Sequence, residues 1–121
     1  MKRFLLIVAL LIGSVSFASA QSPVVTQPKS LASQNYSSTI AVTNTFQSVL
    51  TSSSSRYGCT LQNNGTNSMY VYFGAIANAT TAKSVKLAAG QSVNCNLGGI
   101  VLQDQVSITG TSGEAFYASQ Q

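Results

Sequence analysis

Residues 56–74, RYGCTLQNNGTNSMYVYFG, hold two short apolar runs separated by a polar segment around Asn64-Gly65. Successive side chains of an extended chain point to opposite faces, so each run presents one apolar face. An Asn-Gly pair favours a turn with positive φ, which is typical of the connection between two paired strands. The stretch therefore predicts a hairpin of strands 57–63 and 69–73. Its apolar faces consist of Tyr57, Cys59 and Leu61 in the first strand, and of Met69, Val71 and Phe73 in the second.

Short runs of β-forming residues continue through the rest of the chain from Thr39 onward. They recur about every ten residues between Gly, Asn and Ser clusters, which is typical of an all-β sandwich or barrel. No window keeps helical i, i+3, i+4 spacing over the roughly ten residues that a helix requires. We predict an all-β fold, a single small β-sandwich of about seven to nine short, mostly antiparallel strands. The expected strands are 39–43, 46–51, 57–63, 69–73, 83–88, 91–96, 99–102, 105–109 and 114–118.

The N-terminus has the three parts of a secretory signal peptide. Two basic residues, 2–3, precede an apolar run, 4–12, and small residues occupy 18–20. This order predicts export with cleavage between Ala20 and Gln21. The apolar run is shorter than the about 20 residues that span a bilayer, so we expect no membrane contact after the signal is removed. The mature protein is expected to be secreted, to the periplasm or the extracellular space.

The mature chain divides into an arm and one domain. Residues 21–38 are polar, contain Pro23 and Pro28 and lack sustained periodicity, which predicts an extended arm or linker. Within it, residues 24–26 are β-formers that could add to a sheet edge of this molecule or of a neighbour. The expected division is a signal peptide at 1–20, the arm at 21–38 and the β-sandwich at 39–121.

The two cysteines, Cys59 and Cys95, are most simply one disulfide in an exported protein. Alternation places each thiol on an apolar face, so we expect an interior bridge between the two sheets. Redox motifs keep their cysteines close in sequence, and a zinc site needs further ligands, so neither alternative is favoured. Closing a loop of roughly 37 residues is worth about 3–4 kcal/mol on the chain-entropy account.

Few side chains could carry out covalent chemistry. The chain has no histidine, and its acids are Asp104 and Glu114. They would form a glycosidase pair only if their carboxyl groups were about 5–10 Å apart, and neither flank suggests it. The serines at 52–55 have no base to activate them, and no phosphate-binding glycine motif occurs. We predict that the protein is not an enzyme and has no catalytic residue, metal site or cofactor.

Charge and aromatic residues limit the possible partners. The formal net charge is +4, and without Lys2 and Arg3 of the signal it is +2, from scattered residues. Nucleic-acid binding requires a basic stripe, so we predict none. Tyr70 and Tyr72 project from one face of a strand and are candidates for gripping a sugar or a protein, with other tyrosines nearby. Alternatively, they pack against a second sheet or cover a sheet edge. The other candidates are Tyr57 and Tyr117.

Three motifs indicate a family. They are R-x-x-C-x-L-Q-N at 56–63, Y-V-Y-F-G at 70–74 and L-A-A-G-Q-S at 87–92. Together with their flanks, over residues 46–118, they resemble the small β-sandwich accessory modules of bacteriophage virion and appendage proteins. The resemblance implies that Arg56 opens a core strand, that the third motif turns a hairpin near the rim, and that no catalytic residue is present.

These observations lead to one expected function and one alternative. We expect an exported, non-catalytic structural or interaction module, a component of a surface or extracellular assembly that contacts a protein partner or other copies of itself. The arm would make this contact by strand addition. The alternative is a carbohydrate-binding module in which Tyr70 and Tyr72 hold a glycan.

Overall fold

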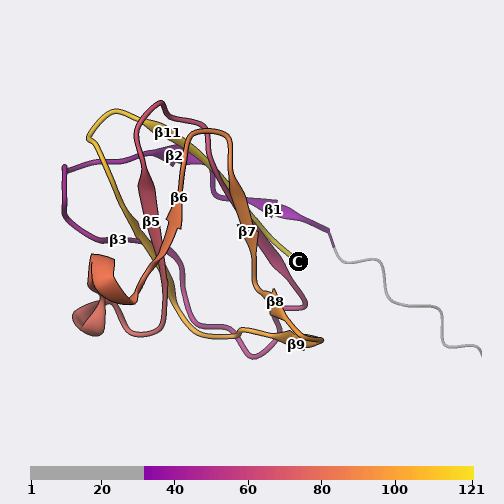
Figure 1. Cartoon of the computed structure of the whole chain (residues 1–121). Helices are drawn as coiled ribbons and strands as arrows, with labels where there is room; N and C mark the ends of the chain where they lie inside the picture. Colours follow the sequence, from indigo (N-terminus) through magenta and orange to yellow (C-terminus); the bar gives the residue numbers. More distant parts are fainter. Residues whose placement is uncertain (1–31) are drawn as a thin grey trace, which may run out of the picture.

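The computed structural model describes residues 32–121, and Figure 1 shows how their strands are arranged. The predicted signal peptide, its cleavage site between Ala20 and Gln21, and most of the predicted arm lie outside the described residues. Two 3-10 turns, η1 at Ile76–Asn78 and η2 at Thr81–Lys83, are the described helical segments. None of these described helices has the length and apolar character that crossing a membrane requires.

The predicted all-β class is confirmed, with antiparallel pairing throughout the described strands. One sheet has the order β1-β11-β4-β7, with β2 also paired to β11, and the second has the order β3-β10-β5-β6. Strands β8 and β9 form a small third sheet. In chain order the strands are β1 Gln34–Asn35, β2 Ser38–Thr39, β3 Gln47–Leu50, β4 Cys59–Asn63, β5 Met69–Phe73, β6 Val85–Leu87, β7 Ser92–Asn94, β8 Asn96–Leu97, β9 Ile100–Val101, β10 Val106–Thr109 and β11 Ala115–Gln120.

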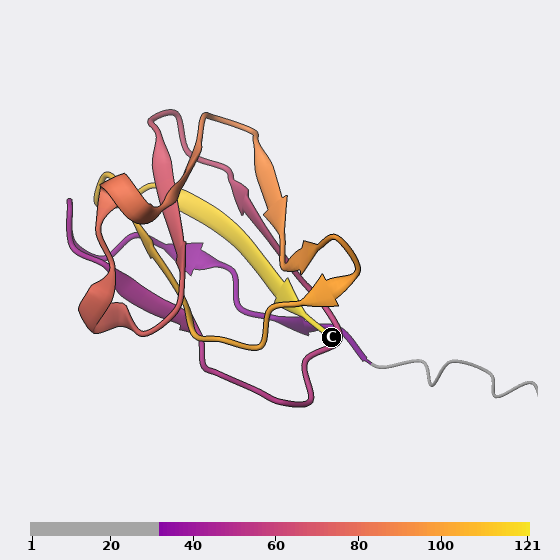
Figure 2. The ribbon, with the colours of Figure 1, turned by 60° about the horizontal axis from the view of Figure 1, so that its bottom comes forward.

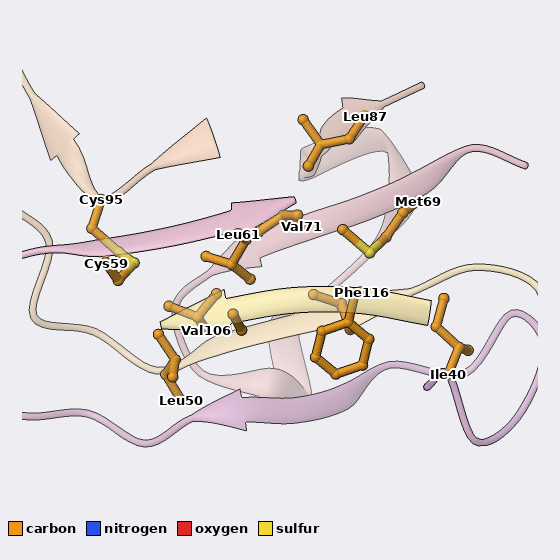
Figure 3. Packing of buried hydrophobic residues seen from close by; sticks show 12 residues of the cluster. Ile40, Leu50, Cys59, Leu61, Met69, Val71, Leu87, Cys95, Val106 and Phe116 are labelled. Carbon is orange, nitrogen blue, oxygen red and sulfur yellow. A yellow bond between two sulfur atoms is a disulfide. The ribbon is translucent and has the colours of Figure 1, made fainter. Parts of the chain in front are cut away.

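The hydrophobic core lies between the two larger sheets, as Figure 3 shows from close by. Burial alternates along β4, where Cys59, Leu61 and Asn63 are buried and the residues between them are half-buried. This alternation is what the period of two in the sequence predicts. The opposing sheet contributes buried residues from β5 and β10. The buried apolar residues are Ile40, Leu50, Cys59, Leu61, Met69, Val71, Leu87, Cys95, Val106, Ile108, Phe116 and Ala118.

The hairpin predicted from residues 56–74 does not form. Strand β4 pairs with β11 and β7, whereas β5 pairs with β10 and β6, so the two strands belong to different sheets. The connection crosses between the sheets because both runs carry an apolar face, and these faces are buried against each other across the core. Gly65 does not have the positive φ expected of an Asn-Gly turn. It is instead packed so closely that a Cβ atom there would overlap the Glu114 carboxylate.

The N-terminal end of the described chain is part of the first sheet. Strands β1 and β2 pair with the edge of β11, so the sheet begins at Gln34, within the segment expected to be an arm. The expected strand at 39–43 stops at Thr39. Beyond it, the Gln47 side chain accepts a hydrogen bond from the Ala41 N–H and donates one to the Thr39 carbonyl, in place of ladder bonds. The division of the mature chain into an arm at 21–38 and a β-sandwich at 39–121 stays a prediction.

Candidate interaction surfaces

The structure contains the Cys59–Cys95 disulfide, with the two Cα atoms 5.0 Å apart. Both cysteines are buried, at 7% and 0% exposure. The expected bridge between the two sheets is wrong in one respect. Cys59 begins β4 and Cys95 directly follows β7, its neighbour in the same sheet, and the Cys95 N–H donates to the Cys59 carbonyl at 3.0 Å. The bridge therefore fastens one corner of a single sheet and does not tie the layers together.

Tyr70 and Tyr72 lie on the outer face of the β3-β10-β5-β6 sheet. They point away from Met69 and Val71, which are buried in the core, and they are themselves half-buried. The Tyr72 ring packs edge-to-face against Phe46, with centroids 6.4 Å apart and an interplanar angle of 74°. The structure thus brings the two predicted tyrosines together and adds Phe46, which the sequence reasoning did not single out.

The other two candidate tyrosines belong to different parts of the molecule. Tyr117 lies on β11 of the first sheet, between the buried Phe116 and Ala118, so its side chain points to the opposite, outer face. Tyr57 precedes β4 and is 65% exposed. The four tyrosines therefore do not form one platform, because β5 and β11 lie in different sheets.

The two tyrosines on β5 cover part of the central strand of their sheet. All four residues of β10 are buried, on both of its faces. Ser107 is paired with Tyr72 and Thr109 with Tyr70, and cross-strand partners place their side chains on the same face. The hydroxyl oxygens of Ser107 and Thr109 have no hydrogen-bond partner among the described residues. This arrangement supports the packing role of the tyrosines, because they shield β10 from water.

The two acids are placed at opposite ends of β10 and do not share a cleft. Glu114 follows the turn after β10, and its carboxylate accepts hydrogen bonds from the backbone and side chains of Thr66 and Asn67. The Thr66 hydroxyl bond, followed by the bonds from Asn67, lowers the pKa of Glu114 below its usual value, against the opposing effect of desolvation. Asp104 precedes β10, and its backbone carbonyl accepts a hydrogen bond from Arg56. The arrangement holds Glu114 ionised and locks the crossing loop, and a glycosidase pair is not formed.

Arg56 is buried, at 3% exposure, and its hydrogen bonds connect two loops and strand β11. Its guanidinium donates to the Gln120 side chain at 3.2 Å and to the carbonyl oxygens of Leu102 and Asp104 at 3.1 and 2.7 Å. A further bond goes to the Thr51 carbonyl. Burial lowers the pKa of Arg56 from its ordinary value. All of its acceptors are neutral oxygens. The charged side chain therefore has a structural role, which is to hold these groups together.

Two shallow cavities flank Tyr57 at the end of the molecule where β4 begins and β11 ends. One, of about 260 Å³, is also lined by Cys59 and Asn96, and the other, of about 360 Å³, by Ala32 and Arg56. Polar groups dominate the wall of the first cavity, whereas polar and apolar groups line the second in similar measure. Residues 32–121 contain no group of three or more His, Cys, Asp or Glu side chains that could hold a metal ion.

Comparisons with known proteins return little. No family model matches the chain. No curated protein matches it either. A solved structure described as "Bacillus endospore appendages form a novel family of disulfide-linked pili" has 16% sequence identity, covers 74% of this chain and 81% of its own, and superposes with a TM-score of 0.47. That protein is a bacterial appendage component and not a virion module, and a likeness this distant carries no argument about function.

Proposed function

We propose that the protein is an exported, non-catalytic structural module that builds a surface or extracellular assembly, by contact with other copies of itself or with a protein partner. The buried disulfide supports a location outside the reducing cytosol. The Glu114 carboxylate holds the crossing loop, and the Asp104 backbone carbonyl accepts a hydrogen bond from Arg56. The remaining features are surfaces, and their geometry favours association over chemistry.

The observation that carries this proposal is how the N-terminal strands are held on β11. The Tyr36 N–H donates to the Ala118 carbonyl at 2.8 Å, and the Ser37 hydroxyl accepts from the Ala118 N–H at 3.2 Å. Every residue from 32 to 39 is nevertheless exposed, so no side chain of β1 or β2 enters the core. The segment is therefore attached to the sheet by backbone hydrogen bonds and by surface bonds of the Gln34, Tyr36 and Ser37 side chains, and not by buried side chains.

A strand held in this way is suited to exchange between molecules. An extended segment that adds to a sheet edge gains affinity from main-chain bonds, and the same bonds can form with an identical edge of another copy. Exchange of an identical element between protomers is an easily accessible route to association. We therefore place residues 21–39 of one copy on the β11 edge of the next.

The test compares oligomers of the mature chain, residues 21–121, with those of two variants at Tyr36. Tyr36→Pro removes the N–H that donates to Ala118, whereas Tyr36→Ala removes the side chain and keeps this N–H. Size-exclusion chromatography with cross-linking should show oligomers in the mature chain and in Tyr36→Ala, and their loss in Tyr36→Pro. Deletion of residues 21–38 should have the same effect as the proline. A strictly monomeric mature chain, indifferent to all three changes, contradicts the proposal.

Carbohydrate binding is a second candidate because Tyr70 and Tyr72 project from one outer sheet face beside Phe46. Aromatic faces bind sugars by stacking, and these rings are half-exposed. A glycan array should then show a saccharide that binds the mature chain and not the Tyr70→Ala, Tyr72→Ala double variant. Tyr117→Ala, on the outer face of the other sheet, is the matched control. If no saccharide on the array binds the mature chain, carbohydrate binding is excluded.

A further inference from the structure

The crossing loop, residues 64–68, connects β4 to β5 and lies at the top of the view in Figure 2. It begins with Asn64-Gly65, the single Asn-Gly pair of the chain. In such a pair the backbone nitrogen of the glycine can attack the side-chain amide carbon of the asparagine, because glycine has no side chain to obstruct the approach. The pair is therefore a chemically reactive position.

The reaction needs water and no other reactant. Attack by the Gly65 nitrogen on the Asn64 Cγ atom closes a five-membered succinimide ring; the nitrogen loses its proton and the side-chain amide leaves as ammonia. Water then opens the ring. Cleavage of the new bond to Cγ gives aspartate, whereas cleavage of the bond to the main-chain carbonyl carbon gives isoaspartate, whose backbone is longer by a methylene group. Both products have a carboxylate in place of the amide.

The two reacting groups of the pair differ in their freedom. Asn64 is exposed, so water reaches its side chain. The Gly65 N–H, in contrast, donates to the Asn63 Oδ1 atom at 2.9 Å. Asn63 is itself only 1% exposed, and its Nδ2 group donates to the carbonyl oxygens of Asn67 and Leu87 at 2.7 and 3.0 Å. The attacking nitrogen is therefore bonded to a buried side chain that cannot turn aside without losing its own bonds.

The backbone on both sides of the Gly65 nitrogen is held as well. The Asn64 N–H donates to the Ala115 carbonyl at 3.1 Å. The N–H groups of Thr66 and Asn67 donate to the Glu114 carboxylate at 3.1 and 3.0 Å. Each backbone N–H from 64 to 67 thus has an acceptor, so ring closure requires the loop to open first.

We propose that Asn64 is a self-modification site that the closed crossing loop keeps unreactive, and that it converts to aspartate or isoaspartate when this loop opens. Proteins open locally as well as globally, and a reaction of the open form proceeds in proportion to its population. Asn63 and Glu114 are then positioning residues, because they hold the loop closed. This proposal is independent of how the chain assembles.

The modified loop should not close as the original does. A carboxylate at position 64 adds a negative charge to the loop that the Glu114 carboxylate binds, and like charges repel. Isoaspartate also lengthens the backbone directly before Gly65, which is bonded to Asn63 and packed against Glu114. Each modified molecule should therefore have a lower melting temperature than the parent.

The experiment incubates the mature chain, residues 21–121, at constant temperature and mildly alkaline pH. Peptide mapping by mass spectrometry distinguishes the amide from the carboxylate at position 64, and enzymatic methylation detects isoaspartate. The parent unfolded in urea, with its bridge reduced, should convert about tenfold faster than the folded parent, or more. Folded Glu114→Ala should also convert about tenfold faster, which corresponds to about 1.4 kcal/mol in the free energy of loop opening.

Arg56→Lys is the matched control, because it weakens contacts that lie outside the crossing loop and should leave the rate at position 64 unchanged. Melting temperatures show whether each variant is folded during the incubation. If Glu114→Ala is not, Glu114→Gln replaces it with a smaller expected acceleration.

Each outcome decides part of the proposal. Equal rates in the folded and the unfolded parent would overturn protection by the fold. No conversion at position 64 in the unfolded chain would overturn the site itself. An unchanged rate in the folded Glu114 variant, or an equal acceleration in Arg56→Lys, would contradict control by the crossing loop.

Discussion

Single residues fasten loops in this protein, and Arg56 and Glu114 show two ways of doing so. Arg56 is a buried cation that donates to three carbonyl groups of two loops, while Glu114 is a surface anion that accepts from the donors of the crossing loop. The sequence identified Cys59 and Cys95 as a disulfide because cysteines in exported chains have few other uses. The role of Glu114 was missed, because its donors are almost 50 residues away, at a sequence separation of 47 and 48.

Replacing Arg56 by methionine should lower the free energy of unfolding by about 2–4 kcal/mol, because the carbonyl oxygens of Thr51, Leu102 and Asp104 then lack their buried donor. Arg56→Lys should recover only part of this loss, since an ammonium cannot reproduce the planar fork of donors. Urea denaturation of the mature chain measures both. Lys86→Met, on an exposed strand, is the control. Equal stability of Arg56→Met and the parent would refute the fastening role.

Because of Glu114, the stability of the fold should decrease as the pH falls into the acidic range. Its folded pKa is lowered by the bonds from Thr66 and Asn67, so its contribution is present above the unfolded pKa, near 4.5, and is lost as the pH falls through the folded value. The melting temperature of the parent should therefore drop between neutral and acidic pH more than that of Glu114→Gln. Identical pH profiles of the two proteins would show that the carboxylate is not held in this way.

At the scale of elements, the alternation in residues 56–74 correctly predicted which side chains are buried but not which strands are paired. Period-two patterning determines the buried face of a strand, whereas the hydrogen-bonding edges carry no sequence signal of their own. Strands β4 and β5 satisfy the pattern equally well as a hairpin or as facing members of two sheets. What decides between them is the connection at 64–68, which Asn63 and Glu114 hold in its crossing path.

Gly65→Ala tests this crossing directly. An added methyl group should overlap the Glu114 side chain and destabilise the fold by about 1–3 kcal/mol. The loss should shrink in a Glu114→Ala background, because the two positions are in contact and their effects are not additive. Gly58→Ala, where a Cβ atom meets nothing within 4 Å, should be close to neutral in the same thermal-unfolding measurement. A Gly65→Ala loss that is unaffected by the background would exclude this contact as its cause.

For the whole molecule, the sequence predicted the class, the two-layered core and the bridge, but not the strand order or the third small sheet. Each of these depends on contacts between distant residues, such as β11 with β4 and with the N-terminal strands. Among the candidate surfaces, Tyr70 and Tyr72 were found from alternation alone. The exposure of Leu97 and Ile100, 58% and 71%, was not predicted, because an apolar pair in a strand is normally expected to be buried.

The disulfide should contribute to the stability of the entire fold through the loop that it closes. The Cys59→Ala, Cys95→Ala double variant should lose about 3 kcal/mol on the chain-entropy account. This loss corresponds to a decrease in melting temperature of more than about 10 °C for a domain of this size. Calorimetry of the two proteins measures the difference. Reactive thiols in the native parent would show that the bridge is not formed.

Strand β11 comes last among the described strands, yet it lies in the interior of the first sheet, between β4 and the N-terminal strands. While the chain is still being synthesised, β4 lacks this partner and Arg56 lacks Gln120. The first sheet therefore cannot be completed before β11 has been synthesised. Under the proposed export, a chain that is still unfolded until then is one that a translocation channel can thread.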